Sequence, residues 1–265
     1  MRIKILRITI LSTIAIFAFS CVSIVKPGVE KVKKVALVSF KSNKAMINRK
    51  DSTTITSLAT LGEGQKKGGN PILAKLLNNT SSLFLKEFGR IEQFKIISGS
   101  SVTGSNAYKK MVAEMKTIWR SLDQGSKAFF NQPLSGYSVI PSGFEIGRNL
   151  SKKHKEGSKK ILVELAKALK VDAVILVDLD LGYEPSVALG GTGAARASVY
   201  ITVYMINKDG EEVIVVYPSN KYSSSGGTLG MIGGNVLFTK KTMPVFAKEA
   251  KIAIQKVIED IKKGL

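Results

Sequence analysis

The chain has 265 residues and a formal net charge of +20 at pH 7, with 40 Lys and Arg against 20 Asp and Glu. This length is ample for a hydrophobic core. One cysteine and one histidine exclude an intramolecular disulfide and the usual zinc centres. The lysines are scattered and do not alternate with aromatics, so nucleic-acid binding is not expected. The charge indicates a lysine-rich solvated surface, or alternatively a preference for anionic membrane or envelope polymer.

The N-terminus, "MRIKILRITILSTIAIFAFSC", starts with three basic residues and continues with an apolar run at 8–19. This pattern predicts an exported protein with a signal peptide at residues 1–20. The run is too short for a membrane span, which needs about 20 apolar residues. Cys21 follows directly. It could pack as a small buried hydrophobe, or act as a thiolate activated by His154, but its place at the end of the signal favours attachment.

The tetrad "AFSC" resembles the lipobox of bacterial lipoproteins. The resemblance implies that residues 1–20 are removed and that Cys21 is acylated, with palmitate among its lipids. Residues 21–34 would then be a lipidated polar tether, and residues 35–265 a single domain. Val22 follows the cysteine, where some bacteria use Asp to retain lipoproteins in the inner membrane, so the outer membrane is favoured.

After the tether, β-forming residues at 35–40 predict a buried strand. The polar, Gly-containing segment 41–70 is expected to be a long insertion. Apolar residues at helical spacing then predict two helices, with a strand between them. The predicted elements are a helix over 71–88 that starts at Pro71 and ends at Gly89, a strand over 94–98 and a helix over 107–122.

A second long connection, 123–150, carries aromatic residues among Gly, Pro and Ser. The next helix leads directly into a strand at 172–181, whose apolar run predicts that both of its faces are covered. Two further strands surround Asp209-Gly210, a hairpin sequence. A Gly/Ser-rich loop at 222–235 precedes the last helix, 242–263. The expected fold is α/β: a mixed sheet of about five strands flanked by helices, with long Gly/Ser-rich loop insertions.

Three segments carry a family resemblance: "KVALVSF" ending at Phe40 before a polar loop, the run 171–176 that ends a helix-to-strand step, and the hairpin 207–211. Their order resembles CsgG-like and TolB-N-terminal-like envelope lipoproteins, a group that includes LpoB. The resemblance covers roughly residues 33–98 and 155–260. It implies an α/β domain without catalytic residues that binds or assembles with partners in the periplasm or at the outer membrane.

Asp178 and Asp180 alternate along one strand, so both carboxylates lie on one face, with Glu184 close by. They could hold a hard cation. Alternatively, the strand leaves the core there and its carboxylates are solvated or paired with nearby lysines, and this second interpretation is preferred. The glycines of "LGGTGAAR" lack the Lys-Ser/Thr of a phosphate loop, and no hydrolase or metalloprotease motif is present. We therefore expect no catalytic residues, no cofactor and no enzyme activity.

The sequence thus predicts a lipid-anchored, non-catalytic binding or assembly module of the cell envelope. Its partners would be the bilayer, through acylated Cys21, and another envelope protein or further copies of itself. The three loops 41–70, 123–150 and 222–235 are the expected contact regions. The alternatives are a CsgG-like oligomeric secretion channel, and a surface adhesin that binds acidic host polymers. The adhesin would use Lys152, Lys153 and Lys155.

Overall fold

The computed structural model describes residues 22–44, 46–50, 70–119, 131–140, 152–189, 192–219, 227–231, 236 and 239–265. Predictions for Cys21 and for the signal peptide lie outside these residues. The strands are β1 (Val22–Ile24), β2 (Lys34–Asn43), β3 (Ile47–Asn48), β4 (Lys95–Ile97), β5 (Asn131–Pro133), β6 (Ala173–Leu189), β7 (Thr192–Asn207), β8 (Glu212–Val216) and β9 (Thr228–Met231). The helices are α2 (Lys26–Val29), α3 (Pro71–Phe88), α4 (Ser100–Thr103), α5 (Asn106–Trp119), α7 (Lys152–Ala168) and α8 (Met243–Gly264).

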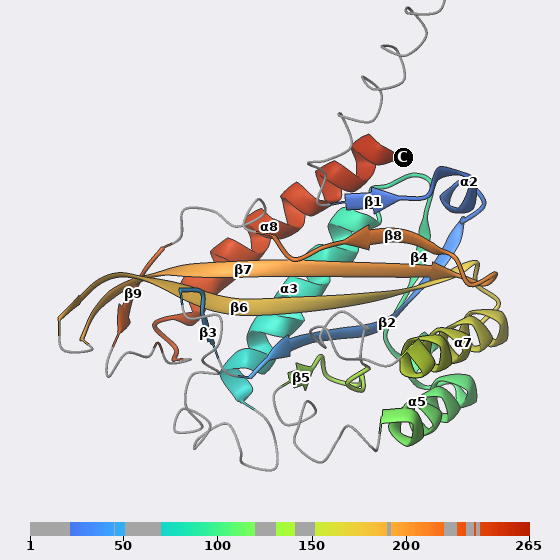
Figure 1. Ribbon diagram of the computed structural model, residues 1–265, viewed down its shortest axis with the longest axis horizontal. Helices are drawn as coiled ribbons and strands as arrows, with labels where there is room; N and C mark the ends of the chain where they lie inside the picture. Colours follow the sequence, from blue (N-terminus) through green and yellow to red (C-terminus); the bar gives the residue numbers. More distant parts are fainter. Residues whose placement is uncertain are drawn as a thin grey trace, which may run out of the picture.

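The described strands form one mixed, open sheet in the order β1-β8-β7-β6-β2-β4, with β3, β5 and β9 paired at its sides. Strand β2 runs parallel to β4 and β6, whereas β6, β7, β8 and β1 are successively antiparallel. Helices α3 and α8 pack on one face, and α7, backed by α5, packs on the other. Helices therefore cover both faces of the central strands (Figure 1).

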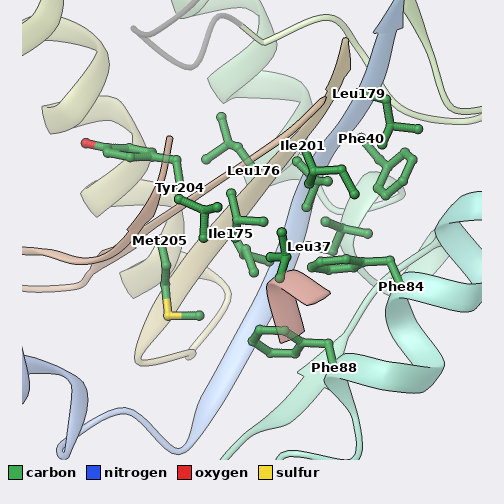
Figure 2. Packing of buried hydrophobic residues seen from close by; sticks show 14 of the residues in the cluster. Leu37, Phe40, Phe84, Phe88, Ile175, Leu176, Leu179, Ile201, Tyr204 and Met205 are labelled. Carbon is green, nitrogen blue, oxygen red and sulfur yellow. The ribbon is translucent and has the colours of Figure 1, made fainter. Parts of the chain in front are cut away.

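The core forms where the sheet is covered on both sides. Residues 173–177 of β6 are almost entirely inaccessible to solvent, as their continuous apolar run predicts. On the α3 face, Phe40 of β2 meets Phe84, and Phe84 stacks on Phe88 at 5.5 Å between ring centroids. Figure 2 shows Phe84 and Phe88 on one side of the strands and Tyr204 pointing to the other. These aromatic side chains fasten α3 to the sheet.

Helix α3 begins where the sequence predicts, because Asn70 caps its N-terminus and Pro71 fits its first turn. The Asn70 side chain accepts hydrogen bonds from the amides of Ile72 and Leu73, and Pro71 occupies the first turn, where no amide donor is needed. The backbone of Asn70 is in turn paired with the Gln132 side chain at 2.8 and 3.0 Å. This pair ties the start of α3 to β5.

A β-bulge in β2 between Leu37 and Ser39 shifts its register against β6. The bulge makes the Val38 carbonyl available, and the Tyr108 hydroxyl of α5 donates a hydrogen bond to it at 3.1 Å. The same hydroxyl accepts a hydrogen bond from the Ser138 amide at 3.0 Å. Tyr108 therefore connects α5, the sheet and the segment 131–140.

The prediction of a mixed α/β fold is confirmed, but the sheet is larger than the expected five strands, with nine among the described residues. Part of the difference lies in the predicted loops: 41–70 contains the end of β2 and all of β3, 123–150 contains β5, and 222–235 contains β9. These strands are two to four residues long. They are too short to give a period of their own, and pairing with a long neighbour defines them.

The described part of the predicted tether, 22–34, also has regular structure. Strand β1 pairs with β8, from Val22 opposite Val216 to Ile24 opposite Ile214. The short helix α2 follows, and Val29 and Val32 lie in the core. This segment closes one edge of the sheet, because its apolar residues find a surface that exists only in the folded domain.

Candidate functional site

Strands β6 and β7 form a hairpin far longer than the predicted strand 172–181. Their pairing runs from Ala173 opposite Asn207 to Leu189 opposite Thr192. Its outer part extends beyond α5 and α7 and is flanked by β3 and β9 (Figure 1). One face of this outer part is apolar and buried, with Tyr183, Ala195 and Leu229 almost inaccessible. The opposite face carries polar residues in three consecutive groups.

The innermost group is a buried ion pair between Lys41 of β2 and Asp178 of β6, which are register neighbours. The Lys41 side chain is 1 % exposed and that of Asp178 is 14 % exposed. Lys41 Nζ lies 3.5 Å from Asp178 Oδ1 and donates a hydrogen bond of 2.6 Å to the Ile140 carbonyl. Burial lowers the pKa of Lys41, and the neighbouring Asp178 carboxylate partly opposes this effect.

The middle group is centred on Arg49, which lies across the hairpin just after β3. Its guanidinium donates to Asp180 Oδ2 at 3.0 Å, to the Asp180 carbonyl at 2.8 Å and to Ser198 Oγ at 3.1 Å. It also lies 3.9 Å from the ring centroid of Tyr200, in a cation–π contact. Gly182 leaves the necessary space, since a Cβ there would lie 2.5 Å from Arg49 Nε.

The outermost group is exposed. Glu184 of β6, Arg196 of β7 and Thr228 of β9 lie side by side in register on the same face, and all three are solvent-exposed. Ser186, at a bulge next to them, is also exposed and donates to the Ala194 carbonyl. We call the surface formed by the three groups, from Lys41 and Asp178 to this exposed row, the polar face.

The prediction that Asp178 and Asp180 share one face of a strand agrees with their positions in β6. Of the solvated or lysine-paired carboxylates that the sequence indicates, Asp178 pairs with a lysine, Lys41, whereas Asp180 pairs with an arginine, Arg49. The pairing cations are Lys41 and Arg49, which come from the predicted insertion. Glu184 lies farther along the strand, in the exposed row. Within the described part of the chain, no three His, Cys, Asp or Glu side chains cluster as metal ligands would.

Sequence reasoning missed Lys41 and Arg49. The signal for Lys41 was its place directly after an apolar strand with no turn residue in between, which allows the strand to continue and bury it. Arg49 carried no such signal, because its position depends on the pairing of Ile47 with Gly182. Of the other predicted site residues, Lys155 is exposed on α7, whereas Cys21 and the side chains of Lys152, Lys153 and His154 lie outside the described structure.

The polar face has charged groups that are already matched at its inner end and exposed groups at its outer end. The inner pairs hold their side chains rigidly, since each cation has several partners. The outer row presents a carboxylate, a guanidinium and a hydroxyl on three paired strands. Such an arrangement is suited to recognition by hydrogen bonds and charge.

Comparisons with protein-family models, with curated proteins and with solved structures find no match. Within the described ranges, no helix has both the length and the apolar content needed to cross a membrane.

Proposed function

We propose that this chain is a lipid-anchored cell-envelope protein, acylated at Cys21 after loss of residues 1–20, that works as a non-catalytic binding or assembly module. The observation that carries the proposal is the N-terminal sequence, in which a basic start and an apolar run at 8–19 lead directly to Cys21. Val22, the next residue, pairs with Val216 in the sheet. The mature chain would then contain the whole described sheet. The resemblance to CsgG-like and TolB-N-terminal-like lipoproteins is part of this proposal, and the outer membrane is its proposed location.

The proposed binding surface is the outer row of the polar face. Glu184, Arg196 and Thr228 are exposed on paired strands, so their backbone is already ordered and binding would restrict only their side chains. The matched ion pairs behind them favour a structural rather than a catalytic role. Lys41, for example, is enclosed and already donates to a carbonyl.

The anchor is tested by labelling bacterial cells that produce the protein with an alkyne analogue of palmitate. The unchanged chain should carry the label and sediment with membranes, whereas Cys21→Ser should do neither. A matched control, Cys21→Ser with Ser23→Cys, keeps one thiol two residues away and should remain unlabelled. Equal labelling of the unchanged chain and Cys21→Ser would refute lipidation at Cys21.

The binding role is tested with a photo-crosslinking amino acid at position 196 in intact cells, against the same group at Lys109, an exposed residue of α5. Adducts of defined mass should form at 196 and not at 109. The mass of the detergent-extracted protein, measured by light scattering, distinguishes this proposal from the alternative of an oligomeric secretion channel. A single species of many subunits that conducts ions would replace the proposal with the secretion channel.

A further inference from the structure

Only one peptide bond separates the proposed lipid attachment residue from the folded sheet. Val22 pairs with Val216 and is 9 % exposed. Consecutive Cα atoms are about 3.8 Å apart across a trans peptide bond. An acyl chain on Cys21 would therefore hold β1 close to the bilayer surface. This step depends on the proposed acylation.

Two exposed hydrophobic residues lie next to β1. Among the described residues, the exposed large hydrophobics are Val25, at 43 %, and Tyr217, at 47 %. Val25 directly follows β1, and Tyr217 directly follows Val216, the partner of Val22. The two residues thus lie at opposite ends of a three-residue strand. A tyrosine with an apolar ring and a polar hydroxyl is the side chain that membrane interfaces favour.

The segment that contains β1 is also basic. Residues 22–34 include four lysines and one acidic residue. Lys26, Lys31 and Lys33 are exposed, as is the acidic residue, Glu30. Lysines close to a bilayer are attracted by anionic headgroups within about one Debye length, roughly 8 Å at physiological salt. The charge of this edge is therefore complementary to an anionic membrane surface.

The end of α8 completes this side of the molecule. A Cβ at Gly264 would touch the Ile24 side chain, so the last turn of α8 lies against β1. Lys262 and Lys263 are exposed there, and Lys263 is paired with Glu259. Figure 1 shows β1, α2 and the C-terminal end of α8 on one side of the molecule, with α5 and α7 on the other.

We propose that β1, α2, Tyr217 and the last turn of α8 form a membrane-docking face that rests directly on an anionic bilayer. Tyr217 and Val25 enter the headgroup region at the two ends of β1, and the lysines of 26–33 contact anionic lipids. The domain is then oriented rather than freely suspended. Its β1 edge faces the membrane, and α5 faces away from it.

The proposal is tested with the acylated full-length protein in vesicles containing phosphatidylglycerol and phosphatidylethanolamine. A polarity-sensitive fluorophore is attached to Tyr217→Cys, with Lys109→Cys on α5 as the matched control. Spin-labelled lipids in the vesicles serve as quenchers. Quenching at position 217 should exceed that at 109 by about threefold or more, and should weaken in Lys26→Glu/Lys31→Glu/Lys33→Glu, as expected for contact with an anionic surface.

Three outcomes would overturn the proposal. The first is equally weak quenching at both positions, in protein that is bound to vesicles and in which mass spectrometry finds Cys21 acylated. This result would mean that the lipid anchor exists but that the domain does not contact the membrane. Absence of acyl mass at Cys21 would overturn the anchor and the docking together. Shielding of position 217 that depends on protein concentration and not on lipid would assign the β1 edge to a second copy of the chain.

Discussion

Replacing Lys41 by Met tests the buried ion pair on which the inner end of the polar face is built. The substitution keeps much of the side-chain volume but removes the ammonium that faces Asp178 and donates to the Ile140 carbonyl. Removing one partner of a buried pair typically destabilises a protein by 3–5 kcal/mol, because the remaining charge loses its counter-charge. Asp178 keeps a 14 % exposed side chain. We therefore expect the lower end of that range, about 3 kcal/mol.

The measurement is denaturant unfolding of the chain from residue 21 onward, followed by circular dichroism, at pH 7. Lys95→Met is the matched control: Lys95 is an exposed strand residue, and the change should stay within about 0.5 kcal/mol. The double variant Lys41→Met/Asp178→Leu removes both charges and should recover at least about 2 kcal/mol, because a hydrophobic pair of similar size avoids the desolvation penalty.

The pH dependence of the free energy of unfolding tests the same Lys41–Asp178 pair independently. Burial lowers the pKa of Lys41, so the unfolded chain binds this proton more tightly than the folded one. Between the lowered pKa and the ordinary value of about 10.4, the stability of the unchanged chain relative to Lys41→Met should rise with pH. A stabilising role of the pair is refuted if Lys41→Met loses no more stability than Lys95→Met. It is also refuted if the double variant loses as much as the single variants Lys41→Met and Asp178→Leu together.

Three further predictions concern other contacts. Gly182→Ala should lower the free energy of unfolding by about 2 kcal/mol, because the added Cβ would lie 2.5 Å from Arg49 Nε and 2.6 Å from the Ile47 carbonyl oxygen, so that both Arg49 and β3 must shift. The same change at Gly230, where no atom lies within 4 Å of the added Cβ, should have little effect, and equal effects at the two positions would contradict this expectation. Burial, together with a nearby carboxylate, raises the pKa of Tyr204. The stability that the protonated Tyr204 contributes should therefore be lost as pH rises above about 10. In a series of unfolding midpoints measured at increasing pH, Tyr204→Phe should lose less stability than the unchanged chain. Burial tends to raise the pKa of Asp172, but hydrogen bonds from backbone amides and from a lysine outweigh this effect and lower the pKa. The stability that the Asp172 carboxylate contributes should therefore be lost as pH falls below about 4. An equally steep loss of stability at low pH in Asp172→Asn would be evidence against this role.

Much of the fold was predictable from local patterns. The start of α3 follows from Asn70 and Pro71, the hairpin β7–β8 from Asp209-Gly210, and the buried centre of β6 from the continuous apolar run at 173–177. Each is a local property, because a cap, a turn or a period of side chains acts within a few residues. The mixed α/β class follows from the order of these elements.

The candidate site and the extent of the sheet depended on contacts between distant residues. Sequence alone placed two carboxylates on one face of a strand, but the cations that neutralise them, Lys41 and Arg49, come from a segment that reads as a polar insertion. Strand β1 likewise exists because β8 offers an edge to it, about 190 residues later in the chain. Such pairings depend on tertiary proximity, which side-chain periodicity does not encode, so only the three-dimensional structure decided them.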